Sequence, residues 1–214
     1  MTKSQCLPGT AAVVAVSRVA PSRAALGAIV ADTRLIIRKA VHNDVAGLVE
    51  MAANAFRDTY REIVDPQDME DYVTTALTSD YFVPHIDDPS SSLLLAIAGG
   101  QLAGYALVTR SAPPVCVDRS SPVELARIYL RSEVIGKGYG ASLMRAVQAE
   151  ARRLRADSIW LGVYDRNVRA RDFYRRWGFI DVGIQEFVLG DKIYADPIMC
   201  APVRTKGTEI IKPD

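Results

Sequence analysis

The residues best suited to chemistry form a glycine-rich run, Ile135-Gly136-Lys137-Gly138-Tyr139-Gly140-Ala141. An apolar segment of strand type, Val123–Leu130, precedes it, and a periodic helical pattern, Gly140–Leu154, follows it. Glycine lets a backbone approach an anion closely, because it has no Cβ and adopts positive φ at little cost. The unpaired N–H groups and the dipole at the start of the following helix attract negative charge. The run therefore predicts a binding site for a ligand that carries phosphates.

Three kinds of phosphate site are compatible with such a run. A P-loop needs Gly-Lys followed by Ser or Thr. Here Lys137 is followed by Gly138, so the hydroxyl ligand for Mg²⁺ is missing and this interpretation is excluded. A dinucleotide site is a closer rival, because Gly136, Gly138 and Ala141 satisfy the loose fingerprint and Asp165 ends the next strand. The order of the surrounding elements argues against a dinucleotide site. The third kind of phosphate site is one for acyl-CoA.

The elements that must position this run follow the order β-α-α-β-β-β-α-β-α-β-β, which predicts a mixed α/β domain. Strands are expected at Leu35–Arg38, Leu93–Ala98, Gln101–Thr109, Val123–Leu130, Ser158–Tyr164, Phe179–Val188 and Lys192–Ala201. Helices are expected at Asp44–Thr59, Met69–Leu77, Gly140–Leu154 and Val168–Trp177. Tyr81–Ser91 contains two prolines and is interpreted as a loop that has room for one helical turn. Hairpins before the glycine run do not fit a doubly wound sheet.

The domain organisation is simple, because 214 residues suffice for one domain with a full core. Residues 1–33 are basic, poor in acids and rich in Ala, Val and Ser, and we expect an unstructured N-terminal extension there. The folded domain is expected over residues 34–203, and residues 204–214 are expected to form a C-terminal tail.

The composition excludes several other classes of protein. A formal net charge of +1 argues against a nucleic-acid partner. Cys6, Cys116 and Cys200 lie far apart, and His42 and His85 are too few for a typical zinc site, so no metal is expected. The odd cysteine count suggests reduced thiols and a cytoplasmic location. No apolar run approaches the ~20 residues of a membrane span, so no membrane partner is expected.

Two motifs together resemble the acyl-CoA site of the GNAT superfamily of N-acetyltransferases. Gly138 and Gly140 fit the family pattern Arg/Gln-x-x-Gly-x-Gly/Ala, with Ile135 where Arg or Gln is usual. A second family signature, Asn-x-x-Ala-x-x-Phe-Tyr-x-x-x-Gly-Phe, is matched by Asn167, Ala170, Phe173, Tyr174, Gly178 and Phe179. The resemblance covers about residues 35–203. It implies a twisted, mostly antiparallel sheet with flanking helices, in which the fourth and fifth strands are parallel and splay apart.

The resemblance also implies acetyl-CoA as co-substrate and assigns residues to it. The backbone of Ile128, Tyr129 and Leu130 would bind the pantetheine amides, because groups left unpaired by the splay need partners. The pyrophosphate would be held by Ile135, Gly136, Lys137, Gly138, Tyr139, Gly140 and Ala141. The Lys137 head group either contacts phosphate or is solvated. Asn167 is either a helix N-cap or a contact to pantetheine.

Two residues receive catalytic roles from the resemblance. Spacing alone makes Tyr174 a core aromatic, whereas the family role makes its hydroxyl the acid that protonates the leaving thiolate. Glu124 is either a general base, acting through water, or a surface glutamate. The implied reaction is direct attack of the amine, with a backbone N–H at the splay stabilising the oxyanion. Cys116 and Cys200 are interpreted as structural or incidental.

The acceptor is expected to contact residues 56–71 and the loop between the last two strands. The first region is acidic, which suits a cationic polyamine or is an ordinary helix surface. Residues 124–130 and 187–191 look closest to bacterial small-amine and polyamine N-acetyltransferases. The acceptor is therefore expected to be a small amine or polyamine, and a protein N-terminus, a lysine or a drug amine is the alternative. A non-catalytic acyl-CoA-binding regulatory module is the second function class, and the family suggests a homodimer.

Overall fold

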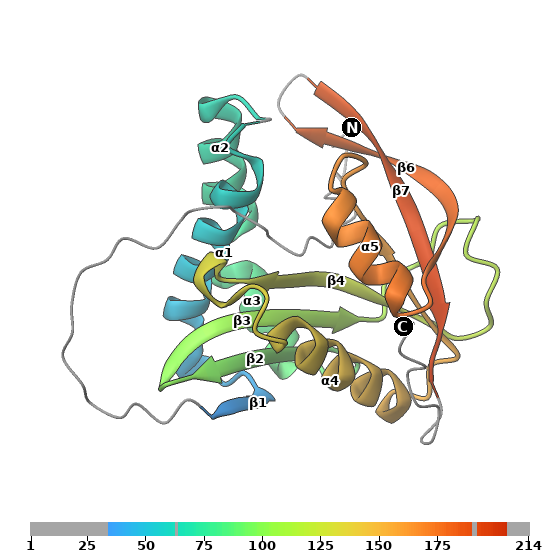
Figure 1. The fold of residues 1–214 in the computed structure, drawn as a ribbon, viewed down its shortest axis with the longest axis horizontal. Coiled ribbons are helices and arrows are strands. Elements are labelled where there is room, and N and C mark those ends of the chain that lie inside the picture. Colours follow the sequence, from blue (N-terminus) through green and yellow to red (C-terminus); the bar gives the residue numbers. More distant parts are fainter. Residues whose placement is uncertain (1–33, 63, 190–191, 205–214) are drawn as a thin grey trace, which may run out of the picture.

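The computed structural model describes residues 34–62, 64–189 and 192–204 (Figure 1). The expected N-terminal extension lies outside the described residues, as do Cys6, nearly all of the C-terminal tail and the turn at Gly190-Asp191. The described residues form one seven-stranded sheet with helices on both faces.

The sheet has the strand order β1-β2-β3-β4-β5-β7-β6, and every neighbouring pair is antiparallel except β4–β5. Its strands are β1 (Leu35–Lys39), β2 (Ser92–Ala98), β3 (Gln101–Thr109), β4 (Pro122–Leu130), β5 (Ser158–Gly162), β6 (Ile180–Leu189) and β7 (Lys192–Pro202). Gly99 and Gly100 both have positive φ, which fits the tight turn predicted between β2 and β3. The predicted mixed α/β fold is confirmed.

Five helices accompany the sheet within the described residues. They are α1 (Val45–Tyr60), α2 (Pro66–Ala76), α3 (Ser79–Asp87), α4 (Tyr139–Arg153) and α5 (Val168–Arg176), with short 3₁₀ turns at His42–Asp44 and Ser132–Val134. The helices α1, α2, α4 and α5 lie where the sequence predicts them, although α2 begins earlier because Asp65 caps it and Pro66 occupies its first position.

The prediction of a loop with at most one helical turn at Tyr81–Ser91 is wrong in extent, because most of the segment belongs to α3. The Thr78 side chain accepts a hydrogen bond from the Tyr81 N–H and so caps the helix. Pro84 removes one hydrogen bond inside the helix, but Phe82 is fully buried against the Tyr105 ring and anchors it. Tertiary burial therefore overrides the helix-breaking tendency of proline.

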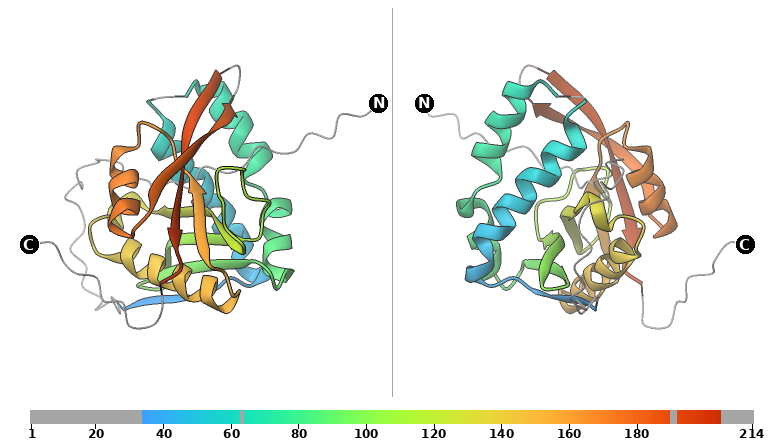
Figure 2. Two further views of the ribbon diagram at one scale, coloured as in Figure 1. Left: turned by 90° about the vertical axis from the view of Figure 1, so that its right-hand side faces the viewer. Right: turned by 60° about the vertical axis from the view of Figure 1, so that its left-hand side comes forward.

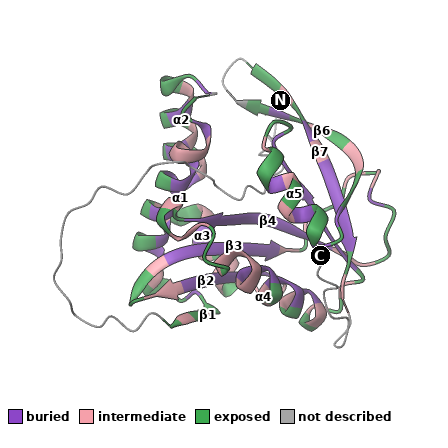
Figure 3. Ribbon diagram, in the orientation of Figure 1, coloured by how far each residue is buried: buried purple, intermediate pink, exposed green. Residues whose placement is uncertain are grey.

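The two faces of the sheet carry separate cores (Figure 2). One core joins α1, α2 and α3 to side chains of β2, β3 and β4, and we call this side of the sheet the α1–α3 face. The other joins α4 and α5 to the opposite side chains of the sheet, and we call it the α4–α5 face. The strands between them are almost wholly buried, whereas the outer part of the β6–β7 hairpin is exposed (Figure 3).

The parallel strands separate early. β4 pairs with β5 only through Pro122–Glu124, while its other edge stays paired with β3 as far as Leu130. β4 contains a bulge at Ala126. Leu125 pairs with Val108 of β3 and Arg127 pairs with Leu107, so Ala126 is the extra residue between them. The predicted splay is thus present, and the bulge turns Arg127 toward the α1–α3 face.

The end of β4 is held by a close approach from β3. A Cβ on Gly104 would lie 2.6 Å from the Tyr129 carbonyl oxygen and 2.5 Å from a methyl group of Leu130. Only glycine fits there, so Gly104 sets the position of the last residues of β4. No helix of the described part of the chain is long and apolar enough to cross a membrane.

Candidate active site

The glycine run forms the tight connection from β4 into α4. Gly136 and Gly138 have φ of 86° and 80°, and Gly138 is the N-cap of α4. Cβ atoms on these two residues would meet nothing within 4 Å. Backbone conformation therefore requires glycine here, and the space beside the loop is open to a ligand.

The loop leaves some of its amides available and uses others. The Ile135 and Lys137 N–H groups donate to the carbonyls of Ser132 and Val134, both at 3.3 Å. The first backbone N–H groups of a helix have no acceptor within it, so those at the start of α4 are directed outward. The Ile135 amide, which the sequence assigned to pyrophosphate, is thus engaged in a long hydrogen bond in this structure.

A cavity of about 330 Å³ lies against this loop. It is bounded by the end of β4, the glycine run and one side of α5, through Leu130, Ile135, Gly136, Gly138, Gly140, Ala141, Arg169, Phe173, Arg176 and Trp177. Its lining thus combines backbone amides, apolar side chains and two guanidinium groups.

The sequence reasoning missed Arg169 and Arg176 as site residues. Together with Phe173 they stand at helical spacing on α5, so one stripe of the helix faces the cavity. The spacing of Arg169, Phe173 and Arg176 in the sequence could have indicated that they share one side of the helix. The ion pairs that α5 makes among the described residues involve Arg171 and Arg175, so the two cavity arginines face it without a carboxylate partner.

Asn167 is the N-cap of α5, and its side-chain oxygen accepts a hydrogen bond from the Ala170 N–H at 3.0 Å. A cap of this kind uses only the oxygen of the amide. The two N–H donors of the Asn167 side chain are not used by the cap.

Tyr174 lies in α5 and is fully buried, with its ring 5.5 Å from that of Phe173 and 5.6 Å from that of Phe179. Burial raises its pKa well above the usual value, and the nearby Tyr129 raises it further. The hydroxyl therefore keeps its proton at neutral pH and acts as a donor. Its interaction with Tyr129 places it near the end of β4, where the strands have separated.

Glu124 is not a surface glutamate, so that alternative is wrong. Its side chain is 3% exposed, and the Ser111 hydroxyl donates a hydrogen bond to it. Glu124 occupies the last residue at which β4 still pairs with β5, opposite Trp160. It therefore lies at the fork of the two strands.

Aromatic rings from four elements face the fork on the α1–α3 face. Tyr60 of α1 lies 5.8 Å from Tyr164, which follows β5, and Tyr164 lies 5.8 Å from Tyr194 of β7. Tyr72 of α2 lies 6.0 Å from Phe187 of β6. Tyr72 thus brings α2 against the β6–β7 hairpin, and Tyr60 of α1 reaches the hairpin through Tyr164. The expected contact of the acceptor with residues 56–71 and with the loop between the last two strands stays a prediction.

Comparison with known families identifies the chain. Residues 49–179 match the model of the acetyltransferase (GNAT) family, which covers more than half of the sequence and includes both motifs. The chain belongs to the GNAT acetyltransferase family. The expected enzyme class is confirmed.

Relatives of this GNAT acetyltransferase carry the same class of name. An uncharacterised N-acetyltransferase of Mycobacterium tuberculosis is 34% identical over 156 residues, which is 73% of this chain and 96% of the relative. An uncharacterised N-acetyltransferase of Lactobacillus delbrueckii is 29% identical over 72% of this chain and 88% of the relative.

Solved structures share the fold. The PaiA N-acetyltransferase of Thermoplasma acidophilum, crystallised with coenzyme A, has a TM-score of 0.63 and 21% identity, over 79% of this chain and 99% of that one. The acetyltransferase yncA of Salmonella typhimurium, with acetyl-CoA, has a TM-score of 0.59 and 19% identity, over 85% and 98%.

The acidic surface of α1 and α2 is partly neutralised in this acetyltransferase. Arg57 forms two hydrogen bonds of 2.7 Å with Glu70, and Arg61 pairs with Asp58 at 2.5 Å. The Asp65 side chain caps α2. Attraction of a polycation by this surface is weaker than the number of its carboxylates suggests.

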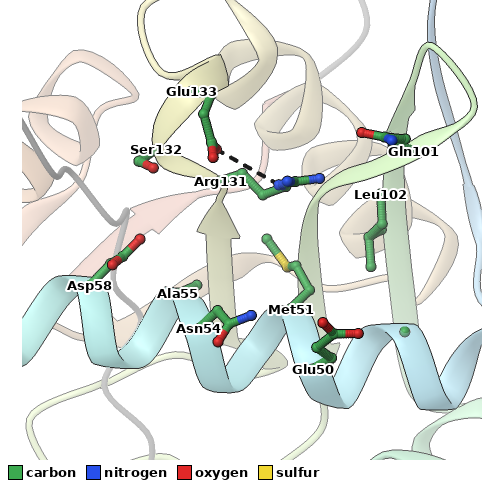
Figure 4. A pocket seen from close by; sticks show the side chains of 11 residues that line it. Glu50, Met51, Asn54, Ala55, Asp58, Gln101, Leu102, Arg131, Ser132 and Glu133 are labelled. Carbon is green, nitrogen blue, oxygen red and sulfur yellow. Dashed lines mark ion pairs between the residues drawn. The ribbon is translucent and has the colours of Figure 1, made fainter. Parts of the chain in front are cut away.

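A second pocket, of about 370 Å³, lies between α1 and the stretch that leads into the glycine run (Figure 4). Its rim mixes the acids Glu50, Asp58 and Glu133 with Arg131, whose Nε lies 3.7 Å from Glu133. Among its lining residues the structure describes no buried polar atom that lacks a partner. This pocket gives no indication of a ligand.

Cysteine and metal chemistry find no support among the described residues. Cys116 and Cys200 pack with Trp160 and Ile198 in a small apolar cluster, and both are free thiols. Burial raises the pKa of Cys200, which disfavours its thiolate. No group of three or more metal-binding side chains is found in this part of the chain.

Proposed function

We propose that this GNAT acetyltransferase transfers an acetyl group from acetyl-CoA to a small primary amine. The observation that carries the proposal is a positive-φ glycine loop that opens α4 beside a splayed strand pair, with the buried Tyr174 nearby. Polyamines are the first acceptors to test, because residues 124–130 and 187–191 resemble polyamine N-acetyltransferases.

The residues present suit the charge of acetyl-CoA. The open space beside Gly136 and Gly138 admits a pyrophosphate to the amides at the start of α4. Arg169 and Arg176 supply the cationic side chains that Ile135 does not. The unpaired edge of β4 at Ile128–Leu130 is available to the pantetheine amides. Tyr139, Lys137 and Asn167 remain predicted contacts.

The protein groups at the fork divide the proton transfers between them. When bound, acetyl-CoA supplies the activated acetyl thioester. Glu124, through a water molecule, accepts a proton from the acceptor ammonium so that the amine nitrogen has a free lone pair. The neutral Tyr174 hydroxyl donates a proton to the departing sulfur. The second proton of the attacking nitrogen passes to solvent water. Tyr174 then regains a proton from the solvent and Glu124 releases its proton to the solvent, so one net proton is set free in each turnover.

A thiol-release assay with acetyl-CoA and a panel of amines, polyamines and peptides tests the proposal. Release with small amines supports it, and release with peptides alone favours a protein acceptor. Tight acetyl-CoA binding without release on any acceptor would make the chain a non-catalytic acyl-CoA-binding module.

Tyr174→Phe tests the acid role within the same assay. We expect kcat to fall about 100-fold, because one general acid contributes about that much, while acetyl-CoA affinity is largely kept. Tyr105→Phe is the control, since it also removes a fully buried hydroxyl but lies on β3. Equal rates for Tyr174→Phe and Tyr105→Phe would remove the assignment.

A further inference from the structure

A buried cation lies on the α1–α3 face, and it has no counter-ion among the residues that the structure describes. The Arg127 side chain belongs to a residue that is 4% exposed, and a guanidinium stays charged in proteins. Its Nη2 donates to the Tyr72 hydroxyl at 3.1 Å, and its Cζ lies 5.3 Å from the centre of the Tyr81 ring. Among the described residues no carboxylate pairs with Arg127, and its Nε has no acceptor. Buried charges are ordinarily paired, so this one needs an anion.

A buried anion on the same side of the sheet also lacks a side-chain partner among the described residues. Asp196 of β7 is 1% exposed, and no side-chain donor of the described residues forms a hydrogen bond with its carboxylate. Gln185 lies opposite Asp196 on β6, yet the Gln185 side-chain N–H₂ also lacks an acceptor. Burial raises the pKa of Asp196 to about 6, only partly offset by the backbone N–H of Asp165, so the carboxylate is mostly ionised at neutral pH.

Tyr60 connects the two charges. This tyrosine ends α1 beside the fork, and its buried hydroxyl has no hydrogen-bond partner in the described structure. Burial raises its pKa; the Asp196 charge raises it further, while the Arg127 charge lowers it, so both charges act on one hydroxyl. The described residues show no ion pair between Arg127 and Asp196 themselves. Ring contacts place both charges around Tyr60: Phe56 lies 4.5 Å from Tyr60 and 4.5 Å from Tyr72, which accepts the hydrogen bond from Arg127. On the other side Tyr164 lies 5.8 Å from Tyr60 and 5.8 Å from Tyr194, two residues before Asp196 on β7.

We propose that the acceptor of this enzyme is bipolar: it brings an anionic group, most simply a carboxylate, to Arg127 and its ammonium to Asp196. The inference rests on the proposed acetyl transfer and narrows its substrate class to amino-acid-like amines. A polyamine would leave Arg127 unpaired and would add like charge beside it. A carboxylate instead forms the bidentate pair that a guanidinium favours.

Acceptors that differ only in the carboxylate test the proposal directly. The assay compares amino acids with their decarboxylated amines, such as phenylalanine with 2-phenylethylamine and lysine with cadaverine. We expect kcat/KM to be about 100-fold higher for the best amino acid than for its amine, since losing one partner of a buried charge pair has effects of that order. An equal or greater kcat/KM for the decarboxylated amines would overturn the proposal.

Variants separate a recognition role from a structural one. Arg127→Met keeps the length of the side chain and removes the charge. It should abolish the preference for amino acids and melt no lower than the wild type, because an unpaired buried charge is removed. Asp196→Asn should lower the rate of acetylation of both the amino acid and its decarboxylated amine, since both carry the ammonium group. An Arg127→Met variant that melts lower and slows both acceptors equally would show a structural role and refute the inference.

A binding measurement keeps this test distinct from the test of catalysis. Thermal unfolding with coenzyme A is followed in the presence of each amino acid or its amine. Stabilisation of the wild type by an amino acid, but not of Arg127→Met, supports the bipolar site even if no acceptor releases thiol and the proposed transfer fails. Turnover of amines without any carboxylate preference supports the transfer and refutes the bipolar acceptor. If no acceptor is turned over and no amino acid stabilises the wild type, the proposed acetyl transfer and the bipolar acceptor are both refuted.

Discussion

The two sides of the splayed strands offer different chemical groups to a ligand. On the α4–α5 face, the cavity beside the glycine loop is built from consecutive residues of one connection and one stripe of α5. On the α1–α3 face, Tyr60, Arg127, Gln185 and Asp196 come from four different elements, and each carries a buried polar atom without a partner. The first side offers mostly backbone amides, and the second offers side chains.

This difference separates what is general from what is specific in the enzyme. A cradle of backbone N–H groups requires glycine only for its conformation, so its chemistry hardly depends on other residues. A set of buried charges selects a ligand by sign and spacing, because each unmet charge carries a desolvation penalty. The comparison predicts that changes on the α4–α5 face alter acetyl-CoA binding, whereas changes on the α1–α3 face alter the choice of acceptor.

The largest effect is expected at the strand that both sides share. In Gly104→Ala, the new Cβ would collide with the Tyr129 carbonyl and the Leu130 side chain. We expect a loss of about 3 kcal/mol or more of unfolding free energy, and a melting temperature lower by roughly 6–12 °C. Calorimetry measures the first effect, and binding of both substrates should weaken together.

Gly47→Ala serves as the matched control for Gly104→Ala. Gly47 lies in α1, and a Cβ there would meet nothing within 4 Å. Alanine should stabilise the helix by about 0.5–1 kcal/mol. If Gly104→Ala melted as high as Gly47→Ala, β3 would not fix the end of β4, and the two sides would not share one support.

An intermediate effect is expected from Asp196 and depends on pH. Its folded-state pKa of about 6 lies above the ordinary 3.8, so the folded state binds the proton more tightly than the unfolded state. Protonation of Asp196 therefore adds up to about 3 kcal/mol to the free energy of unfolding. This contribution is fully present below pH 4 and is lost as the pH rises through 6. Asp196→Asn lacks this titration. Its melting temperature relative to the wild type should therefore rise between pH 5 and pH 8, and a constant difference would contradict a buried, unpaired carboxylate.

The smallest effect is expected at the cofactor cavity. Arg169→Met and Arg176→Met should each raise KM for acetyl-CoA about 10-fold with little change in kcat, because each removes one charge from a solvent-accessible phosphate site. The increase should shrink at high salt. Arg155→Met, beyond the far end of α4, controls for the loss of an exposed arginine. A variant that changed acceptor preference without changing KM for acetyl-CoA would contradict the division between the two sides.

Most of the fold was predictable because its signals are local. The Gly99-Gly100 turn and the apolar runs beside it predicted β2 and β3, and the glycine run marked the start of α4 within one residue. The extent of α3 was not predictable, since Pro84 argues against a helix and the burial of Phe82 that helps to stabilise it is a tertiary contact. The cofactor side followed from the two motifs, although Arg169 and Arg176 required attention to helical spacing.

The sequence by itself determined the glycine cradle, the order of the strands and the family, because these depend on residues close together in the chain. Only the tertiary structure decided that Glu124 is buried at the fork and that Arg127 and Asp196 have no counter-ion among the described residues. Arg127 turns inward because of a bulge in β4, and Asp196 reaches the fork because β7 pairs with β5 and β6. Such pairings join distant segments, so the acceptor side becomes visible only when the strands are assembled.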